Sequence, residues 1–88
     1  MIRLRRSPRR PKLVTLVTRT GCHLCELAEP VVGRLAAQAG VRCEVLDVDA
    51  DPVLRVWSDK VPVVLLDGVE HAYWQVDVKA LRAALRGV

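Results

Sequence analysis

The chain has 88 residues, of which 51% are apolar and only 3% aromatic, so its core must be built from valine, leucine and alanine. This length allows a single domain, and no segment approaches the roughly 20 apolar residues of a membrane-spanning helix. The formal net charge of +4 is uneven, because residues 1–12 hold six basic side chains and no acidic one, which leaves the remainder at −2.

The first twelve residues predict a disordered basic arm ahead of a domain that spans residues 13–88. The arm contains Pro8 and Pro11 and has no apolar periodicity. It is not typical of a secretory signal, because no apolar h-region follows the arginines. A solvated tail is favoured over contact with nucleic acid or anionic lipid, since no aromatic residue accompanies the arginines. We therefore expect a cytoplasmic protein without a nucleic-acid or membrane partner.

The first half of the domain predicts a strand that leads into a helix. Leu13 to Thr18 is apolar on both faces, which is typical of a covered central strand. A helix is predicted from about Cys22 to Ala39, and Gly40 ends it. We expect the buried stripe of this helix to comprise Leu24, Leu27, Val31, Leu35 and Ala39.

The second half predicts a strand, a short helix, a hairpin and a last helix, which gives the order β-α-β-α-β-β-α. The first two strands must be parallel, because a helix crosses over between them, and the last two form an antiparallel hairpin. Cys43 alternates with valines and is expected to be a small buried side chain. The expected elements are a strand over 41–48, a helix over 52–57, strands over 63–66 and 69–75, and a final helix capped by Asp77.

Two cysteines stand at the start of the first predicted helix. Cys22 and Cys25 are spaced i and i+3, which brings them near enough for a small-ring disulfide. A helix N-terminus favours a thiolate over a thiol, and only the first cysteine lies where the unpaired N–H groups point. The pattern predicts a redox dithiol with an exposed nucleophile, Cys22, and a more buried resolving partner, Cys25.

Two other interpretations are compatible with these cysteines. The pair is compatible with a zinc half-site or with two incidental thiols, but zinc requires four ligands, and beyond Cys43 and two scattered histidines no further candidates exist. We therefore expect no metal. His23 either promotes ionisation of Cys22 when protonated or is a plain exposed side chain. Trp57, Tyr73 and Trp74 are candidates for a substrate platform; Trp57 is expected to pack in the core instead, whereas Tyr73 and Trp74 are compatible with either position.

The run Thr18-Arg19-Thr20-Gly21-Cys22-His23-Leu24-Cys25, with Val61-Pro62 ahead of the hairpin, resembles the glutaredoxin-like branch of the thioredoxin superfamily. The resemblance covers about residues 12–86. It implies an α/β thioredoxin-like fold in which helices flank a four-stranded mixed sheet. It also implies that Cys22 and Cys25 are catalytic, that Pro62 is a cis-proline facing them, and that Arg19 is the basic residue beside the site.

The chain departs from that family at the end of the hairpin. Glutaredoxins carry a glycine-rich loop there that grips glutathione, whereas this chain has Tyr73 and Trp74. Glutathione is therefore a disfavoured reductant, and the expected redox group is the Cys22–Cys25 disulfide alone.

The leading functional hypothesis is a monomeric thiol–disulfide oxidoreductase. Its substrate would be a disulfide-containing protein or a small-molecule thiol, its reductant is unidentified, and its substrate groove would comprise Val61, Pro62, Arg19 and His23. The alternative is a non-catalytic glutaredoxin-like module that binds a metal or iron–sulfur cluster through Cys22, or a protein partner.

Overall fold

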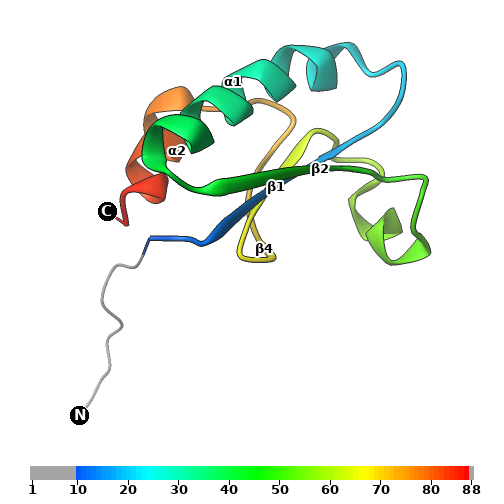
Figure 1. The fold of residues 1–88 in the computed structure, drawn as a ribbon. Coiled ribbons are helices and arrows are strands. Elements are labelled where there is room, and N and C mark those ends of the chain that lie inside the picture. The colour runs from blue at the N-terminus through cyan, green and yellow to red at the C-terminus, as the bar shows by residue number, and fades with distance from the viewer. Residues whose placement is uncertain (1–9, 88) are drawn as a thin grey trace.

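A computed structural model describes residues 10–87 of the chain. Its strands form one mixed sheet in the order β2-β1-β3-β4 (Figure 1). The two α-helices and a short 3-10 helix connect or follow these strands. The elements are β1 (Leu13–Thr18), α1 (His23–Ala39), β2 (Arg42–Asp47), η1 (Pro52–Trp57), β3 (Val63–Leu66), β4 (Val69–Tyr73) and α2 (Val78–Leu85).

Strand β1 lies inside the sheet, as its apolar sequence predicts. It pairs in parallel with β2 and antiparallel with β3, and β3 and β4 form the antiparallel hairpin. The turn of this hairpin is Asp67-Gly68, and both residues have positive φ. The predicted thioredoxin-like topology is therefore confirmed, with the second predicted helix formed as the 3-10 helix η1 behind the capping Asp51.

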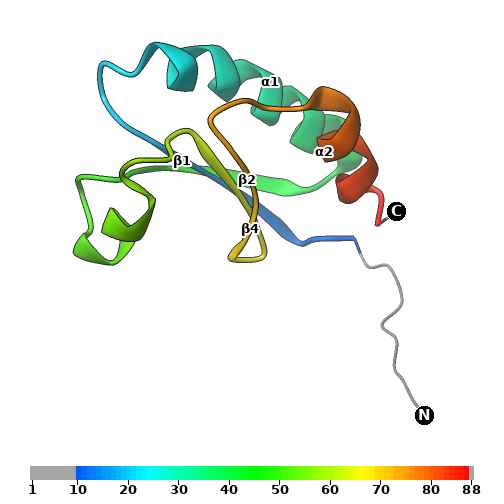
Figure 2. The same cartoon turned by 180° about the vertical axis from the view of Figure 1, so that it is seen from behind.

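The two faces of the sheet are covered unequally. Helices α1 and α2 lie together over one face (Figures 1 and 2), and η1 packs its Leu54 and Trp57 against the other. The core beneath the α-helices consists of Val14, Leu16, Ala28, Val32, Leu35, Ala36, Val41, Val64, Leu81 and Leu85. The smaller core beside η1 consists of Val17, Val48, Val63 and Leu65. No helix within residues 10–87 combines the length and the apolarity needed to cross a membrane.

The predicted buried stripe of α1 is wrong at its N-terminal end. Leu24 is 45% exposed and Leu27 is 56% exposed. The buried face lies one position further along the helix and consists of Cys25, Ala28, Val32, Leu35 and Ala36. Small alanine side chains allow this face to lie close to the sheet. Leu24 and Leu27 instead line a hollow of about 320 Å³ together with Trp74 and Val78.

Cys43 is exposed, so the prediction that it is a buried core residue is wrong. It lies on β2, which is an edge strand. Its side chain lines a hollow between β2 and α1, next to Glu29 and Gly33, rather than the core. Partial burial, with Glu29 and Glu44 nearby, raises the pKa of the Cys43 thiol.

The boundaries of the predicted arm and of two strands also differ from the structure. Residues 1–9 of the arm lie outside the described part, but Pro11 is buried and the Lys12 N–H donates to Asp67 Oδ1 at 2.9 Å. Residues 10–12 therefore belong with the domain. Strand β2 is one residue shorter at each end than the predicted strand over 41–48. Strand β4 ends at Tyr73, two residues before the predicted end, because Trp74 adopts a left-handed conformation with φ +67°.

Candidate active site

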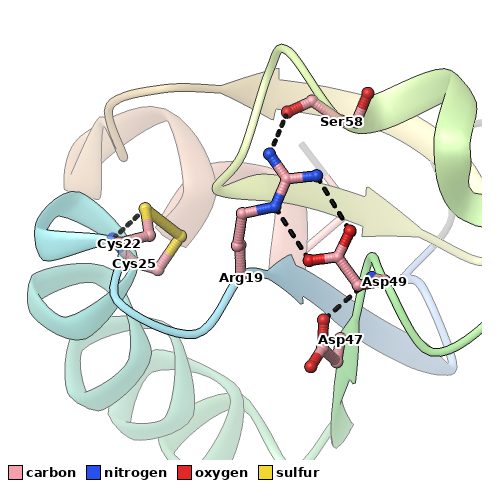
Figure 3. Close-up of polar contacts among 6 residues, drawn as sticks. All are labelled: Arg19, Cys22, Cys25, Asp47, Asp49 and Ser58. Atoms are coloured by element: carbon pink, nitrogen blue, oxygen red, sulfur yellow. Dashed lines mark hydrogen bonds and ion pairs between the residues drawn. A yellow bond between two sulfur atoms is a disulfide. The ribbon is translucent and has the colours of Figure 1, made fainter.

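The two cysteines lie where strand β1 delivers the chain to helix α1. Gly21, with φ +81°, turns the chain, and Cys22 is the N-cap of α1. Cys22 and Cys25 form a disulfide with their Cα atoms 5.2 Å apart (Figure 3). Cys25 is only 3% exposed, whereas Cys22 is half-buried. An attacking thiol therefore reaches Cys22 more readily than Cys25.

The N-cap position supplies Cys22 with a hydrogen-bond donor. The backbone N–H of Cys25 donates to Cys22 Sγ at 3.2 Å. In the reduced protein this donor and the positive end of the helix dipole stabilise a thiolate at Cys22. His23 is exposed at the first residue of α1, and within residues 10–87 its side chain forms no hydrogen bond or ion pair.

Arg19 belongs to the same loop, but its guanidinium points away from the disulfide toward Asp49 (Figure 3). Arg19 Nε and Nη2 donate to the two carboxylate oxygens of Asp49 at 2.9 and 3.0 Å, and Nη1 donates to the carbonyl of Ser58 at 3.3 Å. The Asp49 N–H in turn donates to Asp47 Oδ1 at 2.8 Å. The Arg19 hydrogen bond lowers the pKa of the Asp49 carboxyl, and the same bond raises the pKa of Arg19.

Val61 and Pro62 lie at the same end of the sheet as the dithiol. Val17 of β1 pairs with Val63 of β3, which puts Pro62 beside the end of β1 and the loop to Cys22. The Val61–Pro62 peptide bond is cis, and Pro62 is fully buried. Within residues 10–87, neither the N–H nor the C=O of Val61 has a hydrogen-bond partner.

Trp74 and Tyr73 complete this end of the molecule. The Trp74 backbone N–H donates to the carbonyls of Lys60, at 3.2 Å, and Pro62, at 2.9 Å. Its Nε1–H donates to the carbonyl of Asp59 at 3.0 Å. The two rings meet edge to face, with centroids 5.0 Å apart. Both rings line a hollow of about 440 Å³ with Leu24, a residue of the Cys-x-x-Cys segment.

The structure thus brings the predicted site residues to one end of the sheet, with Arg19 engaged by Asp49. The sequence predicts an effect of Trp74 on glutathione binding, because Trp74 departs from the family's glycines, but it gives no signal for a role of Asp49 or Ser58 at the site. Within the described residues, no three His, Cys, Asp or Glu side chains lie together in a way that could hold a metal ion.

Comparison with known proteins agrees with this arrangement. The family model "Glutaredoxin-like domain (DUF836)" matches residues 13–86. Uncharacterized proteins from Mycobacterium tuberculosis and Mycobacterium bovis are 42% identical over 76 residues, which cover 80% of this chain and 78% of each relative.

Several solved structures share the fold. The solution NMR structure of a Nitrosomonas europaea protein has a TM-score of 0.68 and 26% identity, covering 90% of this chain and 96% of that one. The X-ray structure of a protein from X. campestris has a TM-score of 0.63 and 30% identity, and the match covers 85% of this chain and 97% of that one. Thioredoxin 1 of Thermosipho africanus has a TM-score of 0.64 at 18% identity, and the match covers 84% of this chain and 90% of that one. At this low identity the match shows a shared fold alone.

Proposed function

Because the chain belongs to the glutaredoxin-like domain family, we propose that it is a thiol–disulfide oxidoreductase that reduces disulfides through Cys22 and Cys25. The observation that carries this proposal is the disulfide between a half-buried N-cap cysteine and a buried cysteine one helical turn later. This pairing gives the two sulfurs different access to solvent, which a nucleophile and its resolving partner require.

The reaction proceeds through two exchange steps. The Cys22 thiolate attacks one sulfur of a substrate disulfide, a Cys22–substrate disulfide forms, and the other substrate sulfur leaves as a thiolate. Cys25 then loses its proton and attacks Cys22 Sγ, which releases the second substrate thiolate and forms the Cys22–Cys25 disulfide. The substrate gains two electrons and the protein loses two. A thiol reductant restores the dithiol.

The substrate lies in a groove beside Val61 and Pro62, with Arg19 and His23 at its border. The N–H and C=O of Val61 have no partner within the described residues, and they are suited to pair with an extended substrate as one more strand would. Reduced glutathione is not the main reductant, since Trp74 fills the position where a small residue would let it approach. The protein acts as a monomer in the cytoplasm, where thiol reductants are abundant, on protein or small-molecule disulfides.

A disulfide-cleavage assay with single-cysteine variants tests this function. With dithiothreitol as the electron source, Cys22→Ser is expected to lose turnover of a fluorogenic peptide disulfide. Reduced Cys25→Ser, freed of dithiothreitol and then mixed with the peptide disulfide, is expected to accumulate a mixed disulfide, visible by intact mass as the protein plus half of the substrate. Cys43→Ser is the matched control and should keep full turnover, since Cys43 lies on edge strand β2.

Retained turnover in Cys22→Ser would refute the assignment. Stoichiometric metal in the purified protein together with no turnover in any variant would favour the metal- or cluster-binding alternative.

Alkylation of the reduced protein provides an independent measurement. Cys22 should react with iodoacetamide first, because the Cys25 N–H and the helix N-terminus stabilise its thiolate. Cys43 should react more slowly at neutral pH although it is exposed, because its raised pKa keeps it protonated. Mass-spectrometric mapping across pH measures both rates, and faster labelling of Cys43 would contradict the expectation.

A further inference from the structure

The segment Ser58–Pro62, which leads into strand β3, is held through its carbonyl groups. The carbonyl of Ser58 accepts from Arg19, and that of Asp59 accepts from the Trp74 indole. The Trp74 backbone N–H is shared between the carbonyls of Lys60 and Pro62. Of these five consecutive carbonyls, only that of Val61 has no partner within residues 10–87.

Arg19 connects this segment to the dithiol. Its carbonyl accepts the Cys22 N–H at 3.1 Å, so the backbone of Arg19 forms the turn that leads to the reactive cysteine. Its guanidinium meanwhile joins Ser58 to both oxygens of Asp49 (Figure 3). A bidentate pair with a carboxylate fixes the orientation of the guanidinium plane. Arg19 therefore ties the dithiol loop, the turn after β2 and the segment before Pro62 together.

Trp74 holds the same segment from the side of β4. Its φ of +67° lies in the left-handed region that a bulky side chain rarely adopts. The conformation is held by the N–H bonds to Lys60 and Pro62 and by the bond from the Gln75 N–H to the Tyr73 carbonyl at 2.8 Å. A bulky residue held in such a conformation marks a position with a role of its own, and here the indole N–H reaches Asp59.

We propose that Arg19 and Trp74 are positioning residues that hold Ser58–Pro62 so that the unpaired backbone groups of Val61 face an extended polypeptide beside Cys22. This inference rests on the proposed disulfide exchange and deepens it by naming the substrate class. The Arg19 guanidinium is committed to Asp49 and Ser58, so it does not recognise a substrate carboxylate. The preferred substrate is therefore a polypeptide disulfide recognised through its backbone, whatever the charge of the side chains that flank the cystine.

The first experiment varies substrate charge against Arg19. Three peptide disulfides that differ only in Glu, Gln or Lys beside the reactive cysteine are assayed with Arg19→Gln and Asp49→Asn. A displaced Val61 should lower kcat/KM by about tenfold for all three peptides in both variants, since small misplacements of reacting groups are costly. Arg55→Gln is the matched control, since Arg55 lies near Asp49 but forms no side-chain hydrogen bond within the described residues.

A loss confined to the Glu peptide in Arg19→Gln, with a gain for that peptide in Asp49→Asn, would show that Arg19 binds substrate carboxylates. That result would overturn the inference while leaving the oxidoreductase intact. Unchanged kcat/KM in both variants would overturn it as well. A wild-type protein with no turnover on any peptide would instead refute the proposed function.

The second experiment removes only the indole donor. Trp74→Phe keeps an aromatic ring but loses the bond to Asp59. Tyr73→Phe is the matched control, since it keeps the neighbouring ring and removes only a hydroxyl. Amide hydrogen exchange at residue 74, measured by NMR, should be roughly tenfold faster in Trp74→Phe because the segment opens more often. KM for the Gln peptide should rise in parallel. Unchanged exchange and KM would show that the indole does not hold the segment.

Discussion

Two segments lie at the same end of the sheet at the proposed site, and they are attached to the domain by different forces. The dithiol wall, residues 21–25, is the start of α1, and α1 is anchored by an apolar core that includes Val32, Leu35 and Leu81. The facing wall, residues 58–62, is held by hydrogen bonds from Arg19 and Trp74 and by the burial of Pro62. Only the small core around Val63 and Trp57 lies behind it.

This difference determines which conditions disturb each wall. Burial of apolar surface is insensitive to pH and gives the dithiol wall a large share of the stability of the domain. The ion pair between Arg19 and Asp49 is exposed, with side chains 39% and 61% accessible, so salt and acid weaken it. The attachment of the facing wall is thus more sensitive to salt and acid than the apolar burial that anchors the dithiol wall. Substitutions that weaken one wall and spare the other test this contrast.

Leu81→Ala should loosen the anchor of the dithiol wall. Leu81 lies on α2, is 1% exposed and belongs to the core beneath α1. The truncation should lower the free energy of unfolding by about 2–5 kcal/mol, because it removes buried methyl groups and leaves a cavity. Urea denaturation measures this loss. The control is Val53→Ala on η1. Because the Val53 side chain is 79% exposed, its truncation should lower the free energy of unfolding by less than about 0.5 kcal/mol. Equal losses in the two variants would contradict the contrast.

Trp74→Gly should raise the affinity of the site for reduced glutathione. Glycine adopts the φ of +67° without strain and removes the indole from the hollow beside Leu24. In a Cys25→Ser background, affinity for reduced glutathione should rise by at most about ten- to a hundredfold, as expected for regaining about 1–3 kcal/mol of hydrogen bonds. The loss of the indole bond to Asp59 offsets part of this gain. NMR titration measures both affinities, with Tyr73→Ala as the control for loss of a neighbouring ring. Saturation on the order of tens of micromolar with Trp74 present would refute the blocking role.

Asp77→Ala should weaken the dithiol wall more mildly, through α2. The Asp77 side chain caps α2 by accepting the Ala80 N–H at 3.0 Å. Loss of the cap should cost about 0.5–2 kcal/mol of stability, whereas Asp77→Asn keeps a capping oxygen and should cost little. Thermal denaturation of the two variants compares them directly. An Asn variant as unstable as the Ala variant would mean that the charge of Asp77, and not its hydrogen bond, stabilises the helix.

The same contrast explains how much of this molecule the sequence could predict. The dithiol wall is local: strand, glycine turn, cysteine spacing and helix follow within a few residues of one another, and each has its own pattern. The facing wall depends on pairs distant in the chain, Arg19 with Asp49 and Trp74 with Asp59, for which composition and periodicity carry no signal. Sequence reasoning therefore assigned Arg19 to the substrate groove and missed its carboxylate partner.

The errors in burial have a similar origin. Leu24 and Leu27 have the correct spacing for a buried stripe, but spacing does not say which of two adjacent stripes faces the sheet when the other is rich in alanine. Cys43 alternates as a half-buried strand should, yet it lies on the edge strand β2, and its side chain lines an open hollow beside α1 instead of the core. Both outcomes depend on where α1 rests on the sheet, which is a property of tertiary packing.

The smallest expected effect is the pH dependence of the facing wall. The Arg19 hydrogen bond holds the pKa of Asp49 below its value in the unfolded chain. Folding therefore gains from the pair above the unfolded pKa of about 4, and the gain disappears as pH falls through the lower folded pKa. A double-mutant cycle of Arg19→Gln and Asp49→Asn, measured by urea denaturation, should give a favourable coupling near neutral pH and none in strong acid. Added salt should also reduce the coupling near neutral pH, since both side chains are exposed. A coupling that stays constant across this range would mean that the charge of the Asp49 carboxylate does not stabilise its pair with Arg19.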